Sequence, residues 1–186
     1  MARRTIHTRR KVLAVGLSAL AGVAAAPAFA APRTIYYRAL ALQNVHTGDS
    51  LNAVYWADDY YIPQSLRKIA WLMRDFHSGD IHAIDPKLLD LLVRLKQALG
   101  TTEPFLVTSA YRSPITNARL AAVSEGVAAH SLHMQGKAVD LRLRDRPLRQ
   151  LHAAAVSLRS GGVGYYPSSD FIHVDVGLVR HWVADS

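Results

Sequence analysis

Two histidines and one aspartate are the residues of this chain whose types and spacing suit metal chemistry. His133 and Asp140 stand in Ser131-Leu-His133-Met-Gln-Gly136-Lys-Ala-Val-Asp140, and His173 follows 33 residues later. Two imidazoles and one carboxylate suit Zn²⁺, which they bind at roughly 2.0–2.2 Å, and catalytic zinc sites keep a fourth position open for water. If the three side chains converge, the predicted chemistry is hydrolysis by metal-activated water.

The residue types alone leave a second interpretation open. The chain has nine histidines, eight of them after residue 30, so sets of two histidines and one aspartate arise easily by chance. An isolated histidine is more often exposed or hydrogen-bonded than a metal ligand. We give that interpretation to His46, His77, His82, His130, His152 and His181.

The spacing indicates which elements must position these side chains. Seven residues separate His133 from Asp140, which is not the spacing of two ligands on one helix. We therefore expect a loop or the start of a strand to supply the histidine and the next strand to supply the aspartate, with Gly136 allowing the chain to turn between them. His173 and Asp175 are two residues apart on a predicted strand, so they share one face of it.

Periodicity and turn signals predict an α+β domain, in which a small antiparallel sheet carries the candidate site and helices flank it. Helices are predicted over residues 65–77, 85–100, 115–123 and 147–160. Strands are predicted over residues 31–44, 51–56, 104–109, 137–143 and 171–176, the first two forming a β-hairpin. The glycine-rich residues 161–167 are predicted to form a turn.

The first thirty residues have the composition of an export signal. Basic residues and no acid precede an apolar run over residues 12–26, and Ala28-Phe29-Ala30 supplies the small residues of a cleavage site. Because the run is short and rich in alanine, we expect a signal peptide cleaved after Ala30, the alternative being an uncleaved signal anchor. Thr8-Arg9-Arg10-Lys11-Val12-Leu13 resembles a twin-arginine signal. Residues 31–186 then form one domain, with no stable membrane insertion after cleavage.

Charge and cysteine content exclude several classes of protein. Without residues 1–30 the chain has 17 basic and 14 acidic residues, a net charge of +3. No helix rich in Lys and Arg and no aromatic–basic repeat is evident, so a nucleic-acid partner is not expected. Because there is no cysteine, disulfides and thiolate ligands are excluded, and any metal site must use His, Asp and Glu.

Several motifs together resemble one group of zinc peptidases. Residues 131–140 resemble the zinc motif of the lysostaphin, D-Ala-D-Ala metallopeptidase and hedgehog group, and Ser109-Ala-Tyr-Arg-Ser113 resembles the arginine segment of its D-Ala-D-Ala peptidase branch. Gly161-Gly-Val-Gly-Tyr-Tyr-Pro167, Phe171-Ile-His-Val-Asp-Val-Gly177 and Arg180-His-Trp182 resemble the exported MepK-type (YcbK-like) murein endopeptidases. The likeness extends from residue 40 to residue 183.

The resemblance implies a hedgehog/D-Ala-D-Ala-peptidase-like fold with His133, Asp140 and His173 as the ligands of one Zn²⁺ per chain. It implies a zinc-dependent murein endopeptidase of the periplasm, which hydrolyses peptidoglycan crosslinks between stem peptides containing diaminopimelate and D-alanine. Two alternatives stay open: a zinc D,D- or L,D-carboxypeptidase that trims stem peptides, and a non-catalytic zinc-containing module that binds peptidoglycan or protein. The sequence predicts neither the bond cleaved nor the oligomeric state.

The resemblance also indicates residues for proton transfer and carbonyl binding. In the D-Ala-D-Ala peptidases a glutamate three residues before the last histidine ligand is the general base, and Asp170, one methylene shorter, stands at that position here. Asp175 is the alternative, either as the base or as a partner that orients a histidine. Arg112 is the candidate for binding the substrate carbonyl oxygen, because a fixed guanidinium stabilises developing negative charge. For all three residues the alternative is a solvated residue without a catalytic role.

Overall fold

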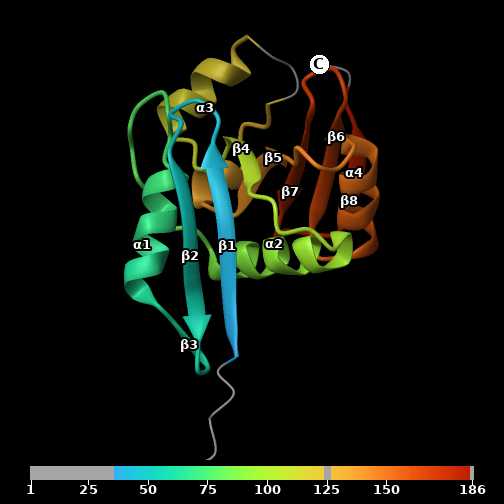
Figure 1. Ribbon diagram of the computed structural model, residues 1–186. Helices are drawn as coiled ribbons and strands as arrows, with labels where there is room; N and C mark the ends of the chain where they lie inside the picture. Colours follow the sequence, from blue (N-terminus) through green and yellow to red (C-terminus); the bar gives the residue numbers. More distant parts are fainter. Residues whose placement is uncertain (1–35, 124–126, 185–186) are drawn as a thin grey trace, which may run out of the picture. The chain divides into compact units, whose positions relative to one another are not determined.

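The computed structural model describes residues 36–123 and 127–184, and the predicted export signal with its cleavage site lies outside them (Figure 1). In the described residues, helices pack against an eight-stranded sheet. The strands are β1 (Tyr37–Asn44), β2 (Ser50–Ala57), β3 (Tyr60–Tyr61), β4 (Phe105–Ser109), β5 (Ala138–Arg142), β6 (Gly162–Tyr166), β7 (Phe171–Asp175) and β8 (Arg180–Val183). The helices are α1 (Pro63–Leu72), α2 (Pro86–Leu99), α3 (Pro114–Ala121), α4 (Leu148–Ser157) and the short 3₁₀ helix η1 (Leu132–Gln135).

The strand order is β3-β2-β1-β4-β5-β7-β6-β8, which confirms the predicted α+β class. The predicted hairpin is the antiparallel pair β1–β2. The sheet is larger than predicted and mixed, because β4 pairs with β1 and β8 pairs with β6 in parallel. Strand β7 is antiparallel to both of its neighbours, β5 and β6, and these three strands form the part of the sheet in which the predicted site residues lie.

Local signals explain the ends of the helices. The helix predicted over residues 85–100 is α2, whose first turn is capped by the Asp85 side chain accepting from the Lys87 N–H, and whose C-cap is Gly100 in the left-handed conformation. The helix predicted over residues 65–77 ends at Leu72 instead, because the Asp75 carboxylate accepts the N–H of His77 and turns the chain. Among the described helices, none is long and apolar enough to cross a membrane.

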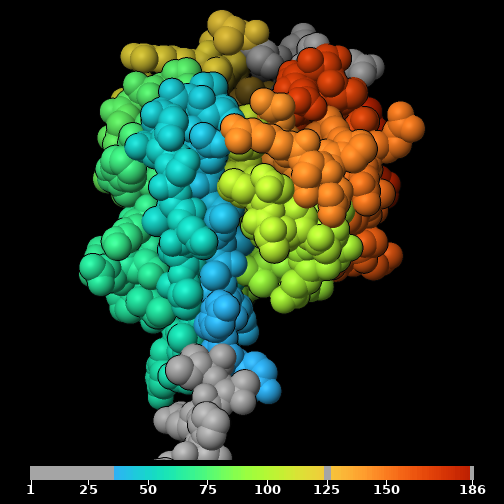
Figure 2. Space-filling model, viewed as in Figure 1, coloured from blue at the N-terminus to red at the C-terminus, as the bar shows by residue number. Residues whose placement is uncertain are grey.

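Alternation along the strands separates a core face of the sheet from a site face. Val139 and Leu141 of β5 belong to the hydrophobic core, and Asp140 between them points to the other side. Helices α2 and α4 pack against each other over the core face, seen as neighbouring green and orange surfaces in Figure 2. The face opposite the helices is therefore free to carry polar side chains.

The prediction of a turn over residues 161–167 is wrong, because residues 162–166 form the strand β6. Glycine favours turns when only the local sequence is considered. Here β7 pairs with one edge of β6 and β8 with the other, and these strands supply the backbone partners that hold the glycines extended. The last strand, β8, was also absent from the prediction.

Candidate metal centre

The three predicted ligands converge on one point of the site face. Asp140 of β5 lies directly opposite His173 of β7 in the antiparallel register. The separations are 2.8 Å between Asp140 Oδ1 and His173 Nδ1, 3.3 Å between Asp140 Oδ1 and His133 Nε2, and 3.2 Å between the two imidazole nitrogens. Ligands bound to one tetrahedral zinc at about 2.1 Å lie about 3.4 Å apart. The donor set therefore fits a zinc-sized ion with little movement.

His133 is supplied by the short helix η1 rather than by a plain loop or a strand start. The Ser131 side chain accepts the His133 N–H, and Gly136, with φ of +63°, ends the turn before β5. His133 Nδ1 lies 2.6 Å from the carbonyl oxygen of Ala110. Because a carbonyl only accepts, Nδ1 must donate, and the lone pair of Nε2 is left to face Asp140 and His173.

The ring of His173 is oriented from its opposite side. Its Nε2 lies 3.1 Å from Oδ2 of Asp175, which confirms that these two residues share a face of β7. A carboxylate only accepts, so in the metal-free ring Nε2 donates to Asp175 and Nδ1 donates to Asp140. When Nδ1 loses its proton, Nε2 still donates to Asp175, and the lone pair of Nδ1 faces the convergence point. In each imidazole, the nitrogen that faces away from the convergence point donates its hydrogen to an acceptor, as it does in metal-binding histidines generally.

The electrostatics of the three buried side chains favour a positive charge between them. Burial lowers the pKa of His173, but its hydrogen bonds to Asp140 and Asp175 outweigh burial and raise the pKa to about 9. Burial raises the pKa of Asp140, but the charge of His133 and hydrogen bonds from both histidines outweigh it and hold the pKa far below its usual range. Either a proton or a metal ion satisfies this arrangement.

A cavity of about 450 Å³ adjoins the centre, and Asp140 and Arg112 both line it. The guanidinium of Arg112 lies 3.6 Å from Asp140 Oδ2 and donates to Ser109 Oγ at 3.2 Å and to Asn117 Oδ1 at 3.5 Å. These partners hold the guanidinium at the cavity wall beside the three converging side chains. A group bound in the cavity would lie close both to the Arg112 guanidinium and to the three converging side chains.

The two candidate bases differ sharply in environment. Asp175 is fully buried, and its carboxylate contacts His173 on the side away from the convergence point. Asp170 lies just before β7 with φ of +53°, its side chain is 64% exposed, and it pairs with Arg142 at 2.8 Å. Its neighbours Ser169 and Phe171 line the cavity, which places Asp170 beside the cavity although Asp170 is not itself one of the lining residues.

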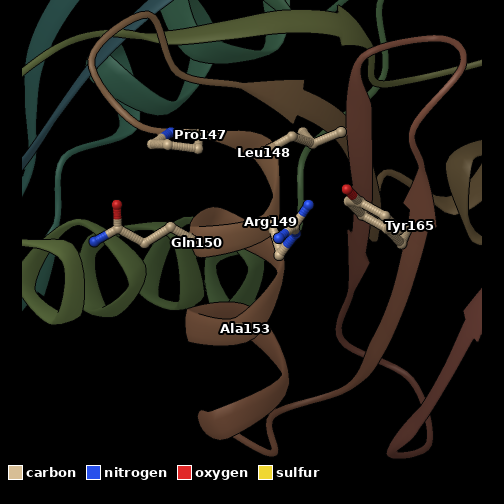
Figure 3. A pocket seen from close by; sticks show the side chains of 6 residues that line it. All are labelled: Pro147, Leu148, Arg149, Gln150, Ala153 and Tyr165. Atoms are coloured by element: carbon tan, nitrogen blue, oxygen red, sulfur yellow. The ribbon is translucent and has the colours of Figure 1, made fainter.

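A second hollow contains none of the predicted site residues (Figure 3). It lies between the start of α4 and β6, where Leu148 and Tyr165 extend toward each other, and has a volume of about 670 Å³. Its lining is mainly apolar and includes one cation, Arg149. We assign it no role.

Two supports of the centre gave no signal in the sequence. The Ala110 carbonyl that fixes His133 is a backbone group, which no residue type reveals. Asp75, placed by the sequence inside a predicted helix, is buried and accepts the Ser113 N–H at 2.9 Å, which fixes the residue that follows Arg112. Arg180 belonged to a motif of the resemblance without an assigned role, and the structure places its guanidinium 2.7 Å from Asp175 Oδ2.

Comparisons with known proteins identify the family of this chain. A family model described as Peptidoglycan L,D-endopeptidase MepK matches residues 32–182. The peptidoglycan L,D-endopeptidase MepK of Escherichia coli K12 is 45% identical over 175 residues, which make up 94% of this chain and 96% of the relative. The probable peptidoglycan L,D-endopeptidase MepK of Haemophilus influenzae is 40% identical over 179 residues, 95% of this chain and 96% of the relative. The resemblance that the motifs indicated is thereby confirmed, and the chain belongs to the MepK family of peptidoglycan L,D-endopeptidases.

Proposed function

We propose that this chain is a zinc-dependent endopeptidase that hydrolyses L,D peptide crosslinks of peptidoglycan in the periplasm. The observation that carries the proposal is the convergence of one potential ligand atom each from His133, Asp140 and His173 beside a cavity lined by Arg112. Family membership supports the predicted class of enzyme, a peptidoglycan endopeptidase of metallopeptidase type. The relatives' names supply the L,D specificity, which the sequence alone left open.

His133 Nε2, Asp140 Oδ1 and His173 Nδ1 would hold the ion. Two neutral imidazoles and one carboxylate, with no cysteine in the chain, form the donor set of a catalytic zinc rather than of a closed structural site. When bound, zinc supplies Lewis acidity, which lowers the pKa of water and polarises a carbonyl group.

Arg112 and Asp170 complete the proposed reaction. The guanidinium of Arg112 binds the scissile carbonyl oxygen and stabilises the negative charge that develops on it. Asp170, beside the cavity, accepts the proton of the attacking water and passes it to the leaving amine. Its carboxylate pairs with Arg142, which is itself partly exposed, so the side chain is held beside the cavity without being enclosed.

Asp175 serves as the partner that orients His173 rather than as the base. Its contact is with Nε2 of the imidazole, whereas the proposed ligand atom is Nδ1. A base must reach the attacking water, and a fully buried carboxylate behind the ligand ring is badly placed to do so.

Digestion of purified muropeptides tests the proposal. The protein without residues 1–30 is incubated with L,D-crosslinked and D,D-crosslinked dimers, with Zn²⁺ or with a chelator, and products are separated by chromatography and weighed by mass spectrometry. We expect L,D-crosslinked dimers to yield monomers only when metal is present. The metal content of the purified protein should be one zinc per chain.

The alternatives give different products. Shortened stem peptides with intact dimers would identify a carboxypeptidase, and retention on sacculi without cleavage by the zinc-loaded protein would identify a binding module. Conversion of D,D-crosslinked dimers alone would overturn the L,D assignment.

Export is part of the proposal and rests on the residues before the described domain. Expression of the full chain in a Gram-negative host should give a periplasmic protein that begins at Ala31. Replacement of Arg9 and Arg10 by lysine should retain the chain in the cytoplasm if the twin-arginine route is used. A protein that still begins at Met1 would support the signal anchor instead.

A further inference from the structure

Two parallel rows of residues cross the site face from β7 through β6 to β8. In the first row His173 lies opposite Gly164, and Gly164 lies beside Trp182. In the second, the N–H of Gly162 donates to Asp175 Oδ1 at 2.9 Å, and Gly162 lies beside Arg180. Each row therefore places a glycine of β6 between a site residue and a large side chain of β8.

The glycines leave the space that those large side chains use. A Cβ atom at Gly162 would collide with Asp175 Oδ2 and with the Arg180 guanidinium, and one at Gly164 would lie 2.6 Å from the Trp182 indole. Across these gaps Arg180 reaches Asp175, and the Trp182 ring comes within 5.3 Å of the His173 ring, centroid to centroid. The glycine-rich segment thus brings two residues of the edge strand to the metal centre.

Besides its contact with His173, the Asp175 carboxylate accepts four hydrogen bonds, all from groups at this corner of the sheet. Oδ2 accepts from Arg180 Nη2 at 2.7 Å, and it is the same oxygen that lies 3.1 Å from His173 Nε2. Oδ1 accepts from Arg180 Nη1 at 3.3 Å and from the N–H groups of Gly162 and Gly177 at 2.9 and 2.7 Å. The two-pronged contact with the guanidinium fixes the carboxylate in rotation as well as position.

Arg180 is itself fixed although its side chain is 46% exposed. Nη1 also donates to the Leu178 carbonyl at 3.0 Å, and the guanidinium carbon lies 5.1 Å from the Trp182 ring centroid. Trp182 in turn donates its indole N–H to the Tyr166 hydroxyl at 3.1 Å. A surface arginine with this many partners is ordered by its surroundings rather than by solvent.

We propose that Arg180 is a positioning residue that acts on His173 through Asp175. The proposal rests on the proposed metal centre and deepens it. By holding the Asp175 carboxylate against Nε2–H, Arg180 fixes the tautomer and the ring orientation that direct the Nδ1 lone pair at the ion. Without Arg180 the buried carboxylate loses two of its hydrogen bonds and the ring loses its rigid partner.

The test measures Zn²⁺ affinity of the mature chain by competition with a chromophoric chelator at fixed pH. Partners of this kind typically change metal affinity about 10–100-fold, and we expect a loss in that range for Arg180→Ala. Arg180→Gln, which is shorter and uncharged but keeps one amide donor, should lose less in the same direction. The matched control is Arg144→Ala. Arg144 donates to Gln43 and takes no part in the proposed contacts of the metal centre, so this variant should bind Zn²⁺ like the wild type.

A double-mutant cycle separates positioning from a general loss of structure. If Arg180 acts through Asp175, Arg180→Ala should change Zn²⁺ affinity little in an Asp175→Asn background, whereas a purely structural role would add its full effect there. Circular dichroism of the metal-free variants checks that each is folded at the assay temperature. If Arg180→Ala does not fold, the cycle is run with Arg180→Gln.

The outcomes distinguish this inference from the proposed function. A wild-type chain that does not bind Zn²⁺ would overturn the metal centre itself. A wild-type chain that binds Zn²⁺, with both Arg180 variants binding within twofold of it or with full additivity in the cycle, would overturn only the role of Arg180.

Discussion

Asp140 and His173 face each other across the antiparallel strands β5 and β7, and Asp140 Oδ1 lies 2.8 Å from His173 Nδ1. The sheet register alone is enough to bring these two residues together, and η1 adds His133 from the end of the same sheet. The nitrogen that carries the proton in this contact is also the proposed ligand atom. Protonation and metal binding therefore compete at one atom.

This competition predicts that Zn²⁺ affinity rises with pH up to about pH 9. Below the pKa of His173, which is about 9, the metal-free imidazole holds a proton that the ion must displace. Apparent affinity should then fall about tenfold per pH unit below 9, and this dependence should vanish above it. Calorimetry at pH 7.5 in buffers of different ionisation enthalpy should show the release of about one proton per Zn²⁺ bound.

The control for this measurement is His152→Ala on α4, which should release the same number of protons as the wild type. No proton release at pH 7.5 by the wild-type chain would contradict the linkage.

Substitution of Asp170 and substitution of Asp175 should have different effects, the first on turnover and the second on Zn²⁺ affinity. Asp170→Asn should reduce kcat by about 10²–10⁴-fold, because it removes the proposed base, and should leave Zn²⁺ affinity within about twofold. Asp175→Asn should weaken Zn²⁺ binding about 10–100-fold, because the His173 ring loses its carboxylate partner. Steady-state hydrolysis of L,D-crosslinked dimers and chelator competition measure the two effects.

Glu103→Gln, an exposed acidic residue outside the site, is the matched control and should change neither quantity. Unchanged kcat in Asp170→Asn, combined with loss of turnover but full zinc content in Asp175→Asn, would reverse the assignment of the base.

Arg112 should matter for the chemical step. Its guanidinium stands at the cavity wall, 3.6 Å from Asp140 Oδ2, where it can bind the scissile carbonyl oxygen. Arg112→Ala should lower kcat/KM about 10²–10³-fold, the usual cost of removing one donor to a developing oxyanion, and Arg112→Lys should recover only part of it. Arg119→Ala on α3 controls for loss of a positive charge, and an Arg112→Ala enzyme as active as that control would remove Arg112 from the mechanism.

The parts of the fold that were predictable are those whose signals lie close together in the sequence. Helix α2 could be placed from Asp85, Pro86 and Gly100 because its caps are neighbours of the segment they end. The strand β6 could not be, because its glycines favour a turn locally and only strands β7 and β8, more distant along the chain, hold them extended.

The candidate site follows the same division. The spacing of His173 and Asp175 placed both on one face, and the contact between them agrees with that prediction. The acceptor for His133 could not be predicted, because it is the backbone carbonyl of Ala110, 23 residues away, and the contact of Arg180 with Asp175 depends on a gap left by Gly162. Long-range contacts of this kind depend on packing between elements, which residue types do not encode one by one.

The carboxylate of Asp75 should make the free energy of unfolding depend on pH. Its side chain is buried, and its two oxygens accept the backbone N–H groups of Ser113 and His77, each at 2.9 Å. Burial raises the pKa of Asp75, but hydrogen bonds from Thr116, Ser113 and His77 outweigh it and hold the pKa well below its usual range. Because the folded pKa lies below the unfolded value of about 3.9, the stabilisation is complete above about pH 4 and is lost as pH falls further.

Asp75→Asn should therefore lower the free energy of unfolding by about 1–3 kcal/mol at pH 7, because the backbone donors of Ser113 and His77 lose a charged acceptor. The difference from the wild type should shrink as pH falls below about 4, because Asp75 is then protonated in the unfolded wild-type chain, and this proton uptake favours unfolding. Urea unfolding at pH 7 and pH 3 measures both values, with Asp145→Asn as an exposed control. A difference that stays constant between these two pH values would mean that the loss comes from packing and not from the charge of Asp75.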